Sequence, residues 1–73
     1  MKNKFTFTFS NKTITKVYSF NKNQKLQMIY NIIYKGWTIE QFLYYLYNIK
    51  DTINLLQEEN GKILEIKIEE EDE

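Results

Sequence analysis

The spacing of apolar residues along the chain predicts two strands, two helices and a third strand. Apolar residues alternate with polar ones from Phe5 to Phe9, and the period of two returns in Thr13–Phe20 and Lys62–Glu69. Such alternation is typical of strands with one buried face. Between them, Leu26–Gln57 has the three- and four-residue spacing of amphipathic helices. We predict an α+β fold in the order β-β-α-α-β, with a small three-stranded sheet packed on two helices.

The first two strands are predicted to form a hairpin around Asn11 and Lys12, because asparagine tolerates the positive φ of a tight turn. Lys16 falls on the apolar face of the second strand, so we expect it at a rim where its ammonium reaches water. The buried face of the sheet is predicted to carry Phe5, Phe7, Phe9, Ile14, Tyr18, Phe20, Leu64, Ile66 and Ile68.

The junction between the two helices is the most specific local signal. Gly36 suits the left-handed residue that ends many helices. Thr38 is predicted to be the N-cap of the second helix, and Gln41 completes a capping box three residues later. Trp37 and Phe42 flank that cap at the spacing of a hydrophobic staple.

The first helix is predicted to begin at a cap supplied by Asn21 or Asn23. Further apolar residues widen its apolar arc to more than half of the circumference, so we expect this helix to be covered on more than one side. Its core-facing stripe is predicted to be Leu26, Ile29, Tyr30 and Ile33.

The second helix is predicted to run without interruption from about Ile39 to Glu59. Its core stripe is predicted to be Phe42, Leu46, Ile49, Ile53 and Leu56. A second row lies off that stripe, and a row that the core does not need is typical of a partner interface. We predict that this interface, in a homodimer or with a target protein, contains Tyr44, Tyr47, Asp51, Leu55, Glu40 and Glu58.

The composition predicts a non-enzymatic protein that holds no metal and no cofactor. The chain has 73 residues, which we assign to one small domain, 1–73. It has no Cys and no His, the residues that supply most disulfides, zinc sites, bases and nucleophiles. A core of this size usually needs support, for example from oligomerisation. Neither a membrane span nor a signal peptide is visible, so we expect a cytoplasmic protein.

The charges are divided between the two halves of the chain. Residues 1–37 contain seven Lys and no acid, whereas residues 38–73 contain three Lys and ten acids. Residues 69–73 are predicted to be a disordered acidic tail. The basic half either protects strand edges or contacts nucleic acid. The lysines that are candidates for phosphate contacts are Lys4, Lys12, Lys16 and Lys22.

The region Leu26–Glu59 also resembles, in part, a helix-turn-helix DNA-binding unit. The resemblance rests on Gly36, Thr38, the helix start at 39–41, Leu46 and 52–53. The segment in the place of a recognition helix departs from the pattern, because Asp51, Glu58 and Glu59 repel phosphate. The chain also has no Arg to bind guanine through two hydrogen bonds.

Residue types with AT-rich codons, such as Lys, Asn and Ile, are abundant, whereas Arg, Ala and Pro are absent. The leading hypothesis is a mobile-element or phage inhibitor that binds and occludes a nucleic-acid-directed host enzyme, of the anti-CRISPR or anti-restriction type. It would act in the host cytoplasm, and acids would occupy a basic channel of the target. One alternative is a nucleic-acid-binding regulator that uses the Lys-rich hairpin or the helix pair. Another is a structural subunit that assembles with itself.

Overall fold

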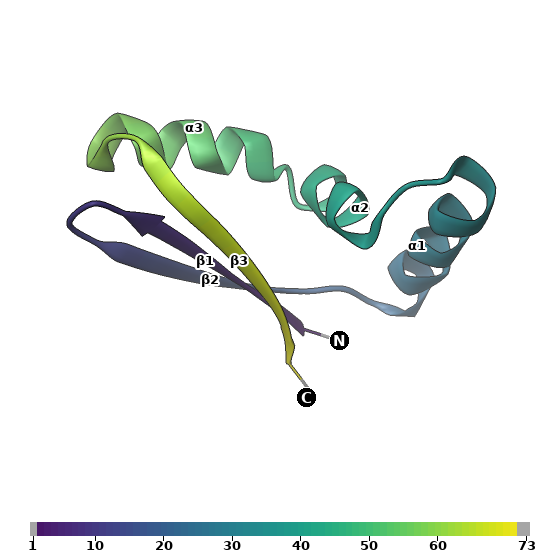
Figure 1. The fold of residues 1–73 in the computed structure, drawn as a ribbon. Helices are drawn as coiled ribbons and strands as arrows, with labels where there is room; N and C mark the ends of the chain where they lie inside the picture. The colour runs from purple at the N-terminus through teal and green to yellow at the C-terminus, as the bar shows by residue number, and fades with distance from the viewer. Residues whose placement is uncertain (1, 72–73) are drawn as a thin grey trace.

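The chain folds into three antiparallel strands and three helices (Figure 1). A computed structural model describes residues 2–71. The predicted α+β fold is confirmed, with one helix more than expected. The elements are β1 (Lys2–Phe9), β2 (Thr13–Ser19), α1 (Lys22–Lys35), α2 (Ile39–Leu46), α3 (Ile49–Asn60) and β3 (Ile63–Glu71).

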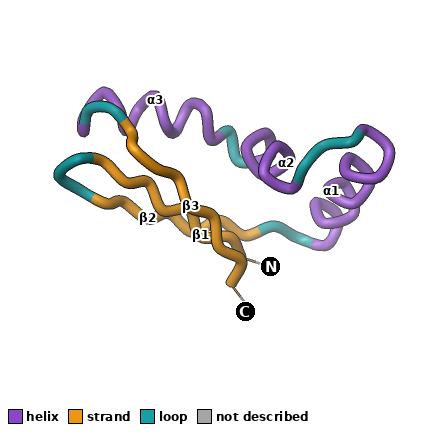
Figure 2. Tube along the Cα trace, in the orientation of Figure 1, coloured by secondary structure: helices purple, strands orange, loops and turns teal. Residues whose placement is uncertain are grey.

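The first strand is the centre of the sheet, whose strand order is β2-β1-β3. Phe5 lies opposite Lys16 of β2 and Ile68 of β3, in antiparallel register with both neighbours. Helices α2 and α3 run along one face of the sheet, and α1 lies beyond its end (Figure 2). The phenylalanine face of β1 is therefore covered by helices, whereas its threonine face is open to solvent.

The core is small and mostly aromatic. Phe5 and Phe7 are fully buried because strands flank them on both sides and helices cover them. The buried apolar residues are Phe5, Phe7, Phe9, Phe20, Phe42, Leu43 and Ile49. Among residues 2–71, Asn3 is the buried polar residue, and its amide nitrogen donates to the Tyr47 hydroxyl at 3.5 Å.

A register shift in β3 changes which residue faces the core. Thr8 pairs with Glu65 but Phe9 pairs with Ile63, so Leu64 is the extra residue of a bulge. The prediction that Leu64 lies on the buried face is wrong, since this side chain is 64% exposed. A bulge inserts one residue into the alternation, and Ile63 therefore takes the inward position.

The predicted junction between the first two helices is confirmed. Gly36 has φ 70°, and the Gln41 backbone N–H donates to the Thr38 hydroxyl at 3.1 Å. The Gln41 side-chain oxygen accepts from the Thr38 backbone N–H at 2.9 Å, which completes the capping box. The rings of Trp37 and Phe42 lie 6.5 Å apart, in the place of the hydrophobic staple.

The first helix is capped by Asn21 and not by Asn23. The Asn21 side-chain oxygen accepts from the Gln24 backbone N–H at 2.9 Å, and the Gln24 side chain returns a bond to the Asn21 backbone. Asn21 can cap because its backbone is extended, whereas Asn23 lies inside the first turn.

The prediction of one continuous second helix is wrong. The helix ends at Leu46, and Asn48 adopts a left-handed conformation with φ 53° before α3 starts at Ile49. Asparagine tolerates this conformation better than other side chains with a Cβ atom, and here its amide nitrogen also donates to Asp51 at 2.7 Å. The break changes the direction of the chain and turns Ile49 into the core.

The prediction that the acidic tail is disordered is wrong for Glu69–Glu71. These residues belong to β3, and the Lys4 ammonium lies 4.0 Å from a Glu71 carboxylate oxygen across the sheet. Lys2 and Lys4 of β1 lie opposite Glu71 and Glu69, so the basic strand favours pairing with the acidic segment. Residues 72–73 lie outside the described range.

We predict that Thr38→Ala lowers the free energy of unfolding by about 1 kcal/mol, because one N–H at the start of α2 loses its acceptor. Thr38→Ser is the matched control, since it keeps the hydroxyl oxygen and should stay within about 0.5 kcal/mol of wild type. Urea denaturation followed by circular dichroism measures both variants. Equal stability of Thr38→Ala and wild type would contradict the role of this cap.

Candidate protein-interaction surface

Helix α1 exposes the apolar side that the sequence assigns to the core. None of its 14 residues is buried. Leu26 and Ile33 are 57% and 65% exposed, and Ile29 and Tyr30 are exposed as well. The prediction that these four residues form a core-facing stripe, and that the helix is covered on more than one side, is therefore wrong.

The two ends of α1, and not its apolar stripe, determine how the helix is oriented. Phe20 precedes the helix and is buried in the core, and the half-buried Trp37 follows it. Because Phe20 and Trp37 pack against the core at the two ends, the inner side of the helix is the one that carries Met28 and Ile32, one turn apart. Met28 packs against the core cluster, whereas Leu26 and Ile33 point away from it.

The exposed side of α1 forms a continuous apolar strip, the α1 outer stripe, made of Leu26, Ile29, Tyr30, Ile33 and Tyr34. The rings of Tyr30 and Tyr34 lie 5.1 Å apart, so they form one aromatic surface. The helix carries no acidic residue. Its charges are Lys22 and Lys25 near the start and Lys35 at the end.

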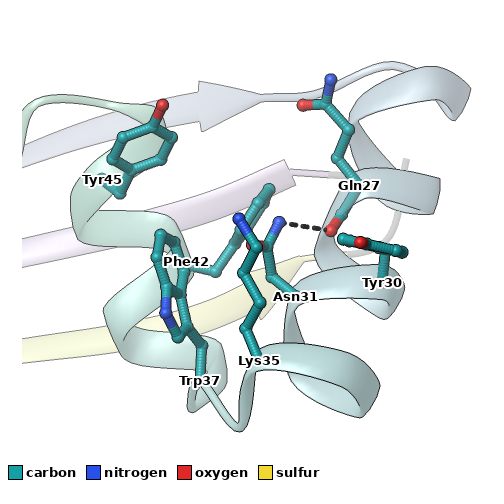
Figure 3. Close-up of a pocket in the computed structure, with 7 residues that line it drawn as sticks. All are labelled: Gln27, Tyr30, Asn31, Lys35, Trp37, Phe42 and Tyr45. Carbon is teal, nitrogen blue, oxygen red and sulfur yellow. Dashed lines mark hydrogen bonds between the residues drawn. The ribbon is translucent and has the colours of Figure 1, made fainter.

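A groove between α1 and α2 continues this stripe toward the second helix (Figure 3). Its volume is about 510 Å³. Tyr30 belongs to both the stripe and the groove, and Tyr45 on the other wall makes an edge contact with Trp37 at 5.4 Å. The Lys35 ammonium lies 5.9 Å from the Trp37 ring centroid. The residues that line the groove are Gln27, Tyr30, Asn31, Lys35, Trp37, Phe42 and Tyr45.

Tyr44 and Tyr47 contact the core and do not belong to a separate outer row. Their ring centroids lie 6.3 Å and 6.2 Å from that of Phe5. Tyr47 also stacks on Tyr18 with the ring centroids 4.7 Å apart. The predicted continuous row from Tyr44 to Leu55 is not formed, because the helix break at Asn48 changes the phase between the two segments.

The remaining residues of the predicted interface lie in two places. Glu40 and Tyr44 line a shallow depression at the start of α2, with Thr38 and Gln41. Asp51, Leu55 and Glu58 are exposed on α3. They share one side of that helix with Glu59, which we call the α3 acidic face.

The candidate phosphate-binding lysines are not gathered on one surface. Lys4 is on the open face of the sheet beside Glu71, and Lys12 is in the hairpin turn. Lys16 is exposed although it lies on the same side of the sheet as Phe5, which agrees with the predicted rim position. Lys22 is at the start of α1, at the other end of β2 from Lys12.

Sequence reasoning missed Tyr45 and the groove it lines. Tyr45 is 71% exposed but follows the buried pair Phe42 and Leu43, so its position in α2 gives little indication of exposure. The groove exists because the chain turns at Gly36 and brings α2 back beside α1, and this geometry depends on the packing of Phe20 and Trp37.

In residues 2–71, no helix combines the length and the apolar character that crossing a membrane requires.

We predict that Tyr47→Phe destabilises the fold by about 1–2 kcal/mol, because the buried Asn3 amide loses the hydroxyl to which it donates. Tyr45→Phe, two residues earlier in the chain, is the matched control. Its hydroxyl is exposed, so its loss should change the free energy of unfolding by less than about 0.5 kcal/mol. Urea melts in which both variants match wild type would show that the hydrogen bond from Asn3 to the Tyr47 hydroxyl does not stabilise the fold.

The same tyrosines predict a loss of stability at alkaline pH. Burial raises the pKa of the Tyr47 hydroxyl, opposed by the hydrogen bond from Asn3. Burial, together with the nearby Glu40 carboxylate, raises the pKa of Tyr44. Above the ordinary tyrosine value of 10.0, the unfolded chain loses these protons more readily than the folded one. The contribution of Tyr44 and Tyr47 to the free energy of unfolding is therefore fully present below pH 10.0. It is lost as the pH rises through the pKa values that these tyrosines have in the folded protein.

Urea melts from about pH 9 to about pH 11 measure this effect. The double variant Tyr44→Phe/Tyr47→Phe should lose less stability over this range than wild type. A double variant with an unchanged alkaline slope would assign the loss to other groups.

Comparison with known proteins places the chain in no family: no family model matches it, and no curated protein or solved structure is significantly similar to it.

Proposed function

We propose that the chain is a non-catalytic protein-binding module whose interface is formed by the α1 outer stripe and the adjoining groove. The observation that carries this proposal is the orientation of α1. A complete amphipathic helix, capped at both ends, presents its apolar side to solvent. Soluble monomers rarely expose a continuous apolar patch of this kind.

The energetics of helices support this assignment. A helix of 14 residues is marginal by itself and obtains most of its stability from packing its apolar face. Burying one large apolar side chain is worth about 1.5–3 kcal/mol, so covering five half-exposed ones gains roughly 5 kcal/mol before the cost of association. A partner protein that covers the stripe would therefore stabilise α1.

The chemistry of the groove supports binding rather than catalysis. Its walls combine four aromatic rings with two amides and one ammonium group, and none of the carboxylates within residues 2–71 lines it. Such walls offer apolar contact and hydrogen bonds to a side chain of a partner. Since the chain also has no His or Cys, the common bases and nucleophiles are missing.

A second surface supports the proposal that the target is a nucleic-acid-directed enzyme. On the α3 acidic face, Asp51, Glu58 and Glu59 surround Leu55, which is 64% exposed. Acids held on a helix can enter a basic channel in place of phosphates. The far end of α3 and α1 lie at opposite ends of the molecule, so both surfaces can be occupied together (Figure 1). With the AT-rich codon signature, this arrangement supports a phage or mobile-element inhibitor of the anti-CRISPR or anti-restriction type.

The nucleic-acid-binding alternative has less support. The basic strand β1 pairs with the acidic strand β3, and Lys4 lies 4.0 Å from Glu71, so much of the positive potential is neutralised. The turn at Asn48 does create a pair of helices, α2 and α3, which is the element that a helix-turn-helix unit would use. The exposed side of α3, which would meet DNA, carries Asp51 and Glu58, which repel phosphate.

Because the abundance of residues with AT-rich codons suggests an AT-rich source genome, capture from a lysate of a low-GC bacterium tests the inhibitor proposal. The tagged full chain should retain a nucleic-acid-directed enzyme and block its DNA cleavage. The double variant Leu55→Lys/Glu58→Lys should bind that enzyme at least about tenfold more weakly, because it reverses the charge of the α3 acidic face. Val17→Lys, an exposed apolar residue on the open face of the sheet, is the control that should bind normally.

If wild type and the double variant retained the same proteins, the α3 acidic face would be rejected as the surface that binds the target. The proposal of an enzyme inhibitor would be rejected if no nucleic-acid-directed enzyme were retained.

A further inference from the structure

We propose that a second copy of this chain covers the α1 outer stripe, with the two α1 helices antiparallel about a two-fold axis. This inference rests on the proposal that the stripe is a protein interface, and it names the occupant. Two-fold dimers are the commonest protein assemblies, and in them the same patch is used by both copies.

The exposed area is large enough for a stable dimer. Tyr30 and Tyr34 are 53% and 75% exposed, which amounts to roughly 250 Å² for side chains that bury about 150–250 Å² each. Leu26, Ile29 and Ile33 add roughly another 250 Å². The total of roughly 500 Å² per copy, or roughly 1,000 Å² for the two copies together, reaches the ~1,000 Å² that marks a biological interface.

The charges of α1 favour the antiparallel arrangement. Lys22 and Lys25 lie near the helix start, where the dipole is already positive and no acid compensates them. A parallel pair would bring four lysines together at one end. An antiparallel pair places each Lys22 and Lys25 beside the carbonyl end of the other helix, which favours cations. Lys35 at that end lies over the Trp37 ring and away from the stripe.

The symmetry of the stripe predicts which residues meet. The stripe runs from Leu26 to Tyr34, so its middle, at Ile29 and Tyr30, lies close to the two-fold axis. Leu26 of one copy then faces Ile33 of the second copy. The dimer closes at two chains and leaves both α3 acidic faces at its outer ends, free to bind a target.

Sedimentation equilibrium tests the dimer with three proteins. Wild type should have twice the chain mass of 9.0 kDa. Ile33→Glu should have the mass of one chain with an unchanged circular dichroism spectrum, because the residue is 65% exposed within the chain. Val17→Glu, which is 54% exposed on the open face of the sheet, should remain a dimer. Wild type at the mass of one chain, an open series of larger species, or a dimer that survives Ile33→Glu would each overturn the proposal.

Cysteine crosslinking tests the antiparallel geometry directly, since the natural chain has no cysteine. A mixture of Leu26→Cys and Ile33→Cys proteins, treated with a short bis-maleimide, should give a crosslinked dimer that joins the two variants. Each variant alone should give at least about tenfold less dimer, because like positions lie far apart along an antiparallel pair. Strong crosslinking of each variant with itself would show a parallel pair and overturn the arrangement.

These outcomes separate the dimer from the proposed function. If wild type has the mass of one chain but Ile33→Glu abolishes capture of a target, the second copy is wrong and the stripe remains a protein interface. If the dimer forms through α1 and no target is captured, the dimer stands and the inhibitor role is replaced by self-assembly.

Discussion

The packing of the β1 phenylalanines beneath α2 and α3 is the interaction on which the rest of the structure depends. Phe5 is fully buried and contacts Phe7, Tyr18, Tyr44 and Tyr47 through their rings. A central strand is the position where such a row can be covered by strands on two sides and by helices above. Tyr44 of α2 and Tyr47, which follows that helix, complete this cluster and pack against the core with part of their surface.

A core concentrated at β1 leaves α1 outside it. The helix is attached through Phe20 before it, Trp37 after it and Met28 within it, and its remaining apolar surface has no contact of comparable extent. For a chain of this size, a helix held in this way is a means of presenting an interface on a rigid support. The same arrangement explains why the domain, with its few buried residues, gains stability when the stripe is covered.

The division of charge along the chain becomes an internal match in the folded protein. The acidic segment pairs with the basic first strand, as in the contact between Lys4 and Glu71, and this neutralises part of the sheet. Helix α1 carries lysines and no acid, whereas the α3 acidic face carries Asp51, Glu58 and Glu59 toward the other end of the molecule. This polarity is compatible with a dimer through α1 that turns its acidic ends outward.

Local signals in the sequence determined the class of fold, the strands and the capped junction at Gly36 and Thr38, because alternation, capping and left-handed turns depend on neighbouring residues. The tertiary structure alone decided three features: the break at Asn48, the bulge at Leu64 and the outward side of α1. The bulge and the outward side of α1 depend on contacts between distant segments. The break uses the local tolerance of Asn48 for a left-handed conformation, and the packing of Ile49 in the core is what selects it. Leu26 and Ile33 have the spacing of a core stripe, but the spacing of apolar residues shows only that a side must be covered. Whether the cover comes from the same chain or from another is decided by where Phe20 and Trp37 hold the ends of the helix.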